Sequence, residues 1–138
     1  MDREAKIHTI ENNLAILIRR FKRTMNDFQG SPLTAHEFSF LYYLNKHHKE
    51  TASNIAKKFE VSPSYATTVI DKLIRSGYVE RKRSETDRRI VFLTVTDEGH
   101  SLYQKLNVLR RDYLRKVFQE FDDEELSQLE ILIAKLIQ

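Results

Sequence analysis

The spacing of apolar residues along this chain predicts a mainly helical protein. Near the N-terminus, apolar side chains recur every three or four positions and mark one long amphipathic helix. They are Ile7, Ile10, Leu14, Leu17, Phe21, Met25 and Phe28. The segment Gln29-Gly30-Ser31-Pro32 then ends that helix. Shorter apolar stripes of the same period predict five further helices.

Capping residues predict where those five helices begin. The predicted N-caps are Thr34, Thr51, Ser62, Thr96 and Asp122. Glu37 lies three residues after Thr34, and Glu125 lies three residues after Asp122, which is the spacing of a capping box. Pro63 comes directly after Ser62, at the first helical position, where its missing N–H costs nothing. Gly77 suits the left-handed position after the helix over 62–76.

A different pattern follows Gly77, where two β-type runs flank a charged tip. The second run contains the β-branched or large apolar residues Ile90, Val91, Phe92, Leu93 and Val95. Five basic residues (Arg81, Lys82, Arg83, Arg88 and Arg89) and two acidic ones (Glu85 and Asp87) give the tip a net charge of +3, equal to that of the whole chain. The predicted order is α-α-α-α-β-β-α-α, a mainly α fold with a small β-hairpin.

The helices over 51–59 and 62–76 are joined by a two-residue turn and form a predicted helix-turn-helix. In that motif the second helix lies in the major groove of DNA, with its N-terminal residues at the base edges. The candidates for base contact are Ser62, Ser64, Tyr65, Thr67 and Thr68, and those for phosphate contact are Lys72 and Arg75. The alternative is an ordinary exposed helix whose polar face is simply solvated.

The charged hairpin directly after this motif favours the DNA-binding interpretation. A narrow minor groove attracts inserted arginine, which suits a tip with Arg88 and Arg89, and Arg83 joins the same basic set. Asp87 is placed to pair with a neighbouring arginine and brace the loop. The alternative for this hairpin is a charged edge that only prevents aggregation.

The stretch Asp87-Arg88-Arg89-Ile90-Val91-Phe92-Leu93-Thr94, followed by Thr96, Glu98 and Gly99, resembles the Asp-x-Arg wing of MarR-type winged-helix transcription regulators. The stretch from Ser62 to Val79, with its Leu-Ile-x-x-Gly-Tyr-Val ending, is similar to that family's recognition helix. The resemblance covers essentially the whole chain. It implies one domain over 1–138, with a winged helix-turn-helix core over 34–95 between dimerisation helices in 1–30 and 98–138. It also implies that Asp87 and Arg89 form or support the DNA-contacting wing tip.

A homodimer is expected both from the resemblance and from the apolar stripes of the terminal helices, which a core over 34–95 is too small to cover. The expected interface residues are Ile7, Ile10, Leu14, Leu129, Leu132, Ile133 and Leu136. The alternative is a monomer whose terminal helices cap its own domain. A two-fold dimer requires a pseudo-palindromic double-stranded operator with half-sites about 10 bp apart.

The family likeness further implies a repressor that a small-molecule effector releases from DNA. Such ligands would lie between the dimerisation helices and the core. On that basis the candidate lining residues are Arg19, Arg23, His36, Phe40 and Tyr43.

Composition excludes several other classes of protein. Hydrophobic residues make up 41% and charged residues 31%, typical of a globular protein, and no apolar run or signal sequence points to a membrane, so a cytoplasmic location is expected. The absence of cysteine excludes disulfides, thiolate metal sites and a thiol switch. We find no catalytic or metal-binding motif and expect no enzyme activity, cofactor or metal. The rival function is a winged-helix module that binds protein without specific DNA binding, which the basic tip disfavours.

Overall fold

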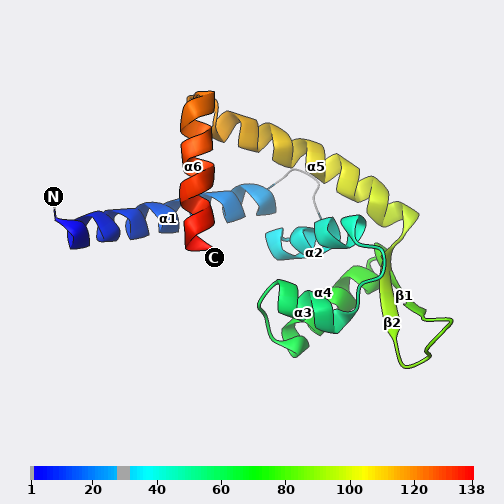
Figure 1. Cartoon of the computed structure of the whole chain (residues 1–138). Helices are drawn as coiled ribbons and strands as arrows, with labels where there is room; N and C mark the ends of the chain where they lie inside the picture. Colours follow the sequence, from blue (N-terminus) through cyan, green and yellow to red (C-terminus); the bar gives the residue numbers. More distant parts are fainter. Residues whose placement is uncertain (1, 28–31) are drawn as a thin grey trace. The chain divides into compact units, whose positions relative to one another are not determined.

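The computed structural model of this chain describes residues 2–27 and 32–138, and over those residues the predicted element order is confirmed (Figure 1). The helices are α1 (Arg3–Asn26), α2 (Ala35–Lys46), α3 (Ala52–Lys58), α4 (Pro63–Arg75), α5 (Asp97–Val117) and α6 (Asp123–Leu136), and the strands are β1 (Val79–Arg83) and β2 (Val91–Val95). Phe28 and the predicted helix end at 29–31 lie outside the described residues. In the described part of the chain, no helix has the length and apolarity that a membrane span requires.

The hydrophobic core lies where α2, α3 and α4 pack together beside the hairpin. The largest fully buried side chains are Phe40, Leu41, Leu44, Ile55, Ile70, Leu73, Val79, Leu93 and Leu106. All four residues predicted to form the inner face of the helix over 62–76 are buried, namely Ala66, Val69, Ile70 and Leu73. This packing fixes one side of α4 and leaves the opposite side exposed.

The helix starts agree with the predicted caps. Thr34, Thr51, Ser62 and Asp122 each accept a hydrogen bond from the backbone N–H three residues on. Asp122 and Glu125 form a complete capping box. At Thr34 the predicted capping box was wrong, because the Glu37 side chain does not bond back to the cap. Its Oε1 instead accepts from Nζ of Lys72 at 2.5 Å. Glu37 is only 5% exposed, and its buried charge is stabilised by this cation.

Gly77 turns the chain from α4 into β1. Its φ is +84°, and the N–H groups of Gly77 and Tyr78 donate to the carbonyls of Ile74 and Leu73, both at 3.0 Å. This pair of bonds is a Schellman motif, which confirms the predicted left-handed position.

β1 and β2 pair antiparallel, from Val79 opposite Val95 to Arg83 opposite Val91. Glu50, just before α3, extends the sheet with one bridge, in which its carbonyl accepts the N–H of Leu93 at 2.8 Å. Three of the five basic residues assigned to the tip therefore lie on β1. The tip itself is the loop over 84–90.

The chain divides into two compact units, residues 1–106 and 107–138. In the first, Met25 is the one buried residue of α1, and Ile7, Ile10, Leu17 and Ile18 are about half exposed. In the second, α6 has no buried residue, and Leu132 and Leu136 are 57% and 67% exposed. Each terminal helix thus carries apolar side chains that this single chain leaves in water.

Candidate nucleic-acid interface

The exposed side of α4 carries the residues that the sequence predicts to face DNA. Ser62, Ser64, Tyr65, Thr67, Thr68, Lys72 and Arg75 are all exposed. Apolar residues at a helical spacing anchor the opposite side of α4 in the core, so these polar side chains share one surface. The sequence pattern alone was sufficient to place them.

The hydroxyl groups on this surface differ in how much of their hydrogen-bonding capacity is already used within the protein. Ser62 Oγ accepts the N–H of Tyr65 at 3.1 Å, so this side chain serves as the helix cap. Thr68 Oγ1 donates to the carbonyl of Ser64 at 3.0 Å, which leaves its methyl group and its lone pairs exposed. The side-chain hydroxyl of Thr67 has no hydrogen-bond partner within the described part of the chain. Thr67 and Thr68 therefore retain the most capacity to contact bases.

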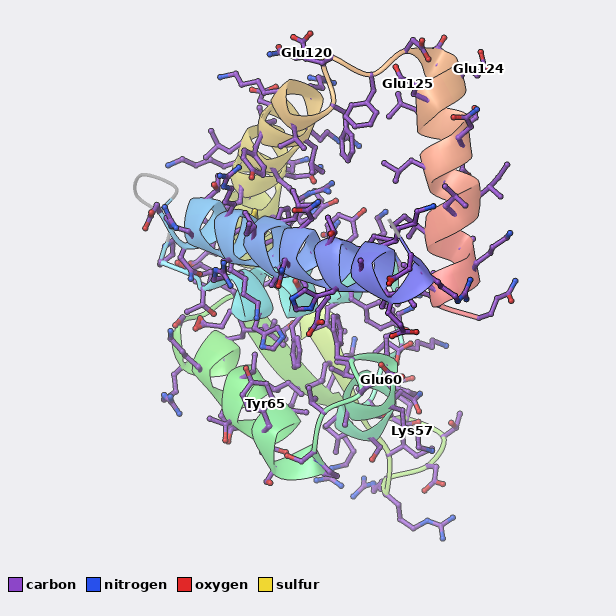
Figure 2. All side chains as sticks on the ribbon, turned by 90° about the vertical axis from the view of Figure 1, so that its left-hand side faces the viewer. Lys57, Glu60, Tyr65, Glu120, Glu124 and Glu125 are labelled. Carbon is purple, nitrogen blue, oxygen red and sulfur yellow. The ribbon has the colours of Figure 1, made fainter. Side chains whose placement is uncertain are left out.

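Tyr65 is held by a contact across the fold. Its hydroxyl lies 2.6 Å from Nδ1 of His36 on α2, and the two rings meet edge to face at 5.6 Å between centroids. The side chain is still 40% exposed and projects from the N-terminal part of α4 (Figure 2). The hydroxyl is thus engaged with α2, while the ring remains open to a partner.

The basic residues beside α4 divide into two that bind acids and one that is unpaired. Lys72 neutralises Glu37, as described above, and thereby ties α4 to α2. Arg81 on β1 pairs with Asp71 of α4 at 2.5 Å and ties the hairpin to the same helix. Sequence reasoning gave neither side chain this role. Arg75 has no ion pair among residues 2–27 and 32–138 and remains available for a phosphate.

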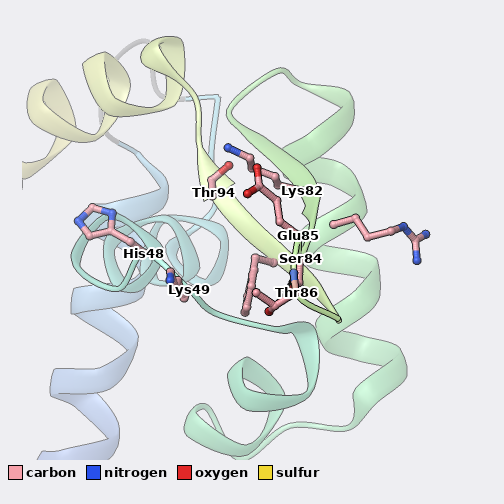
Figure 3. A pocket seen from close by; sticks show the side chains of 9 residues that line it. His48, Lys49, Lys82, Ser84, Glu85, Thr86 and Thr94 are labelled. Carbon is pink, nitrogen blue, oxygen red and sulfur yellow. Dashed lines mark hydrogen bonds between the residues drawn. The ribbon is translucent and has the colours of Figure 1, made fainter. Parts of the chain in front are cut away.

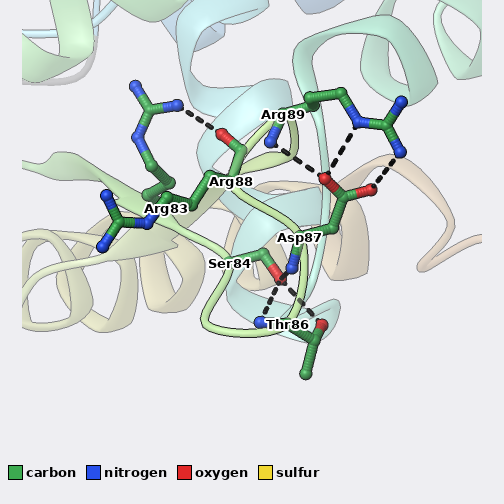
Figure 4. A network of polar contacts seen from close by, with 6 residues as sticks. All are labelled: Arg83, Ser84, Thr86, Asp87, Arg88 and Arg89. Atoms are coloured by element: carbon green, nitrogen blue, oxygen red, sulfur yellow. Dashed lines mark hydrogen bonds and ion pairs between the residues drawn. The ribbon is translucent and has the colours of Figure 1, made fainter.

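The tip of the hairpin is braced by Asp87 (Figure 4). Its Oδ1 accepts from the backbone N–H and Nε of Arg89 at 3.0 and 3.1 Å, and its Oδ2 accepts from a terminal guanidinium nitrogen at 3.1 Å. These hydrogen bonds from Arg89 hold the pKa of Asp87 below its ordinary value. The predicted pairing of Asp87 with a neighbouring arginine is confirmed, and the Arg89 side chain is still 91% exposed.

Ser84 forms the base of the tip and was not singled out in the sequence. It is 8% exposed, and its Oγ accepts from the N–H groups of Thr86 and Asp87 at 3.3 and 3.2 Å. A serine three residues before an aspartate is the available signal for this kind of turn. Arg83 donates to the carbonyl of Arg88 and braces the tip from β1. The guanidinium of Arg88 has no partner in the part of the chain described.

Of the five residues proposed to line an effector site, three lie on α2 and two on α1, and the rings of His36 and Phe40 are 6.5 Å apart between centroids. Phe40 is fully buried and stacks on Phe59 in the core at 4.6 Å. Burial, together with the charge and hydrogen bond of Glu50, raises the pKa of Tyr43, whose hydroxyl donates to that carboxylate at 3.3 Å. Arg19 and Arg23 are exposed on α1.

His36 is the member of that set that lines a hollow at the start of α2. The hollow is formed by Lys22, Asn26, Thr34, Ala35, His36 and Tyr65. Among residues 2–27 and 32–138, no group of three or more histidine or acidic side chains is placed to hold a metal ion.

Comparison with known proteins agrees with this geometry. The profile of the MarR family matches residues 33–91. An uncharacterised helix-turn-helix-type transcription regulator of Bacillus subtilis, YwhA, is 31% identical over 71% of this chain and 70% of its own length. The B. subtilis transcriptional repressor MdtR is 28% identical over 94% of this chain and 84% of its own. A cysteine-to-serine mutant of MarR from E. coli, solved with operator DNA, superposes with a TM-score of 0.85 over the full length of both chains, at 21% identity.

Proposed function

The chain belongs to the MarR family of DNA-binding transcription regulators, which are not enzymes, and we propose that it is a homodimeric repressor whose operator is released by a small-molecule effector. The observation that carries the proposal is the fixed connection between two DNA-facing features. The polar face of α4 and the braced hairpin belong to one compact unit, and the Arg81–Asp71 ion pair joins them. Family membership also favours DNA over protein as the partner of the wing.

In this proposal α4 reads bases in the major groove. Ser64, Thr67 and Thr68 present hydroxyls that donate or accept, and the threonine methyl groups fit the thymine methyl. Arg75 binds a backbone phosphate nearby, because its guanidinium is exposed and unpaired. Ser62 caps the start of this helix, and Lys72 anchors the helix to Glu37 of α2.

The wing tip would enter the adjacent minor groove. Arg88 supplies an unpaired cation, and Arg89 supplies a second cation whose direction Asp87 fixes. A pre-oriented arginine loses less conformational entropy on binding than a free one, which favours the insertion. The groove of an A·T-rich step attracts such side chains through its negative potential.

Dimerisation would involve the apolar side chains left exposed on α1 and α6, within the regions 1–30 and 98–138. Exposed apolar patches of this kind in a single chain mark association surfaces. Because the dimer is two-fold, its operator would be a pseudo-palindrome. Binding there would block transcription, as the name of the relative MdtR, a transcriptional repressor, suggests, and would take place in the cytoplasm.

The effector is proposed to bind in the hollow between Lys22, His36 and Tyr65. A small organic anion would pair with the ammonium of Lys22 and replace Tyr65 as the partner of His36. The hydrogen bond between His36 and Tyr65 connects this hollow to the start of α4, so its loss would move the base-reading end of the helix. Tyr65→Phe should therefore reduce the effect of an anionic ligand on operator affinity, with His8→Phe as the matched aromatic control on α1.

The test of the whole proposal is selection of bound sites from random duplex DNA with the full chain. We expect a pseudo-palindrome whose half-sites are about 10 bp apart from centre to centre. Failure to enrich any sequence would refute specific operator binding. Enrichment of a single half-site with 1:1 stoichiometry would refute the dimer while leaving base readout intact.

A further inference from the structure

We propose that the outer face of the wing holds a second phosphate-binding site, built by Lys49, Lys82 and Thr94, for the operator strand on the side of the wing away from α4. The inference rests on the proposed function and extends it to residues that no family likeness has assigned. It also predicts that the protein contacts DNA outside its two half-sites.

The strand register defines this outer face. Side chains alternate between the two faces of a strand, and Leu93, which is 2% exposed, marks the face toward the core. Arg81 lies opposite Leu93 and shares that inner face. Lys82 lies opposite Phe92, and these two residues share the outer face with Thr94.

A hollow lies on the outer face, between the wing and the loop that precedes α3 (Figure 3). Its lining residues are His48, Lys49, Lys82, Arg83, Ser84, Glu85, Thr86, Phe92 and Thr94. Because these residues come from two segments far apart in sequence, the hollow exists only in the folded chain. The guanidinium of Arg83 donates to the carbonyl of Arg88 at the tip, so its position is fixed by that turn and not by a ligand in the hollow.

The unpaired charges of the hollow favour an anion. Lys49 and Lys82 are exposed, and neither forms an ion pair within the described residues. Glu85 is the one acidic residue among those that line the hollow, and it is labelled together with Lys82 and Thr94 in Figure 3. The lining therefore carries two lysines against Glu85, while Glu80, opposite Thr94 on the same face of the hairpin, does not line the hollow.

Thr94 supplies an unused hydrogen-bond donor. Its Oγ1 is buried and has no hydrogen-bond partner within the described residues, whereas buried hydroxyl groups in proteins are normally satisfied. Thr94 lines the same hollow as Lys82 and Glu85, and all three are labelled in Figure 3. Ammonium and hydroxyl groups are among the donors that proteins use to bind phosphate oxygens, and this hollow is lined by both.

The position of the hollow identifies the operator backbone as the source of the phosphate. A minor groove is only about 6 Å wide and has a phosphate backbone on each side. If Arg88 and Arg89 enter the groove, one backbone passes the inner face, near α4, and the other passes the outer face. Lysine side chains on the outer face are long enough to reach that second backbone.

The experiment compares salt-dependent affinity on two duplexes. One carries the selected operator with ten additional base pairs on each side, and the other ends at the half-sites. Lys49→Gln/Lys82→Gln should lower the slope of log affinity against log salt by about 3.6 on the long duplex, for four lysines per dimer at 0.9 each. On the short duplex the salt slopes of the lysine variant and the wild type should be equal. Glu85→Gln should tighten binding to the long duplex, and Lys105→Gln on α5 should leave both slopes unchanged.

Two controls separate the failure of this inference from that of the proposed function. If the lysine variant, with an unchanged melting temperature, binds both duplexes like the wild type while Arg88→Ala/Arg89→Ala loses affinity, the outer site is refuted and the wing assignment stands. If the arginine variant also binds normally, the wing assignment fails as well. If pyrophosphate without DNA raises the melting temperature of the wild type but not of the lysine variant, and operator affinity is unaffected, the hollow binds a free phosphate and the DNA source is refuted.

Discussion

Asp87 and Arg89 show how one side chain can decide the function of another. In the proposed complex, Asp87→Asn would remove a negative charge next to DNA, so charge alone would tighten operator binding. If the carboxylate instead orients Arg89, the substitution should weaken binding several-fold. Fluorescence anisotropy with the selected operator distinguishes the two, and tighter binding by Asp87→Asn would contradict the bracing role. Arg89→Ala should weaken binding and lower the salt slope by about 1.8 per dimer.

The same pair sets the pH range in which the tip is braced. Since the folded-state pKa of Asp87 is lowered from its ordinary value of 3.8, its contribution is complete above that value and is lost as the pH falls through the lowered pKa. The tip should therefore remain braced from neutral pH down to about 3.8. A carboxyl NMR titration measures this directly. Arg89→Ala should return the pKa of Asp87 toward 3.8, and an unchanged titration would exclude Arg89 as the cause.

Lys72 is predicted to stabilise the fold more than it binds DNA. Lys72→Met keeps the aliphatic stem but leaves the carboxylate of Glu37 buried without its cation. The free energy of unfolding should fall by about 1–2 kcal/mol, a range discounted for the half-exposed ammonium. Urea denaturation provides the measurement, and Glu37→Gln/Lys72→Met should recover most of the loss. Unchanged stability with a lower salt slope would instead identify Lys72 as a phosphate ligand.

At the scale of elements, the wing is fixed to its neighbours at one crowded junction. Thr96 Oγ1 donates to the carbonyl of Gly77 at 2.6 Å and accepts the N–H of Gly99 at 3.0 Å, so the end of α4 and the start of α5 share one side chain. A Cβ at Gly99 would lie 2.1 Å from the carbonyl oxygen of Tyr78. The close approach of α5 to Tyr78 therefore leaves no room for a side chain at position 99.

Two alanine substitutions test that junction. Gly99→Ala forces backbone apart and should cost about 1–3 kcal/mol of stability. Gly77→Ala meets the movable carboxylate of Glu98 at 3.2 Å and mainly pays for its left-handed φ, about 1 kcal/mol. Thermal unfolding of the two variants should therefore rank Gly99→Ala as the less stable. The reverse order would show that the approach of α5 to Tyr78 is not a tight constraint.

At the scale of the whole molecule, operator affinity should depend on association through the terminal helices. Leu132→Glu places a charge in the exposed apolar stripe of α6 and should give a monomer of 16.4 kDa by light scattering. In a dimer, binding of the first recognition helix holds the second at a high effective concentration near its half-site. The monomer lacks this advantage and should lose roughly a hundred-fold or more in operator affinity. Ser127→Glu, on the opposite side of α6, is the matched control. A dimeric Leu132→Glu would exclude this stripe from the interface.

The sequence by itself determined the elements, the caps, the inner face of α4 and the pairing of Asp87 with Arg89. Each of these depends on residues within a few positions of one another, so periodicity and spacing are enough to reveal them. Tertiary structure decided which charged and polar side chains remain free. Lys72, Tyr65 and Arg81 look equally available in the sequence, but Glu37, His36 and Asp71 engage them from other elements. Folding brings these partners together across ten to thirty-five positions, and no local pattern encodes such a distance.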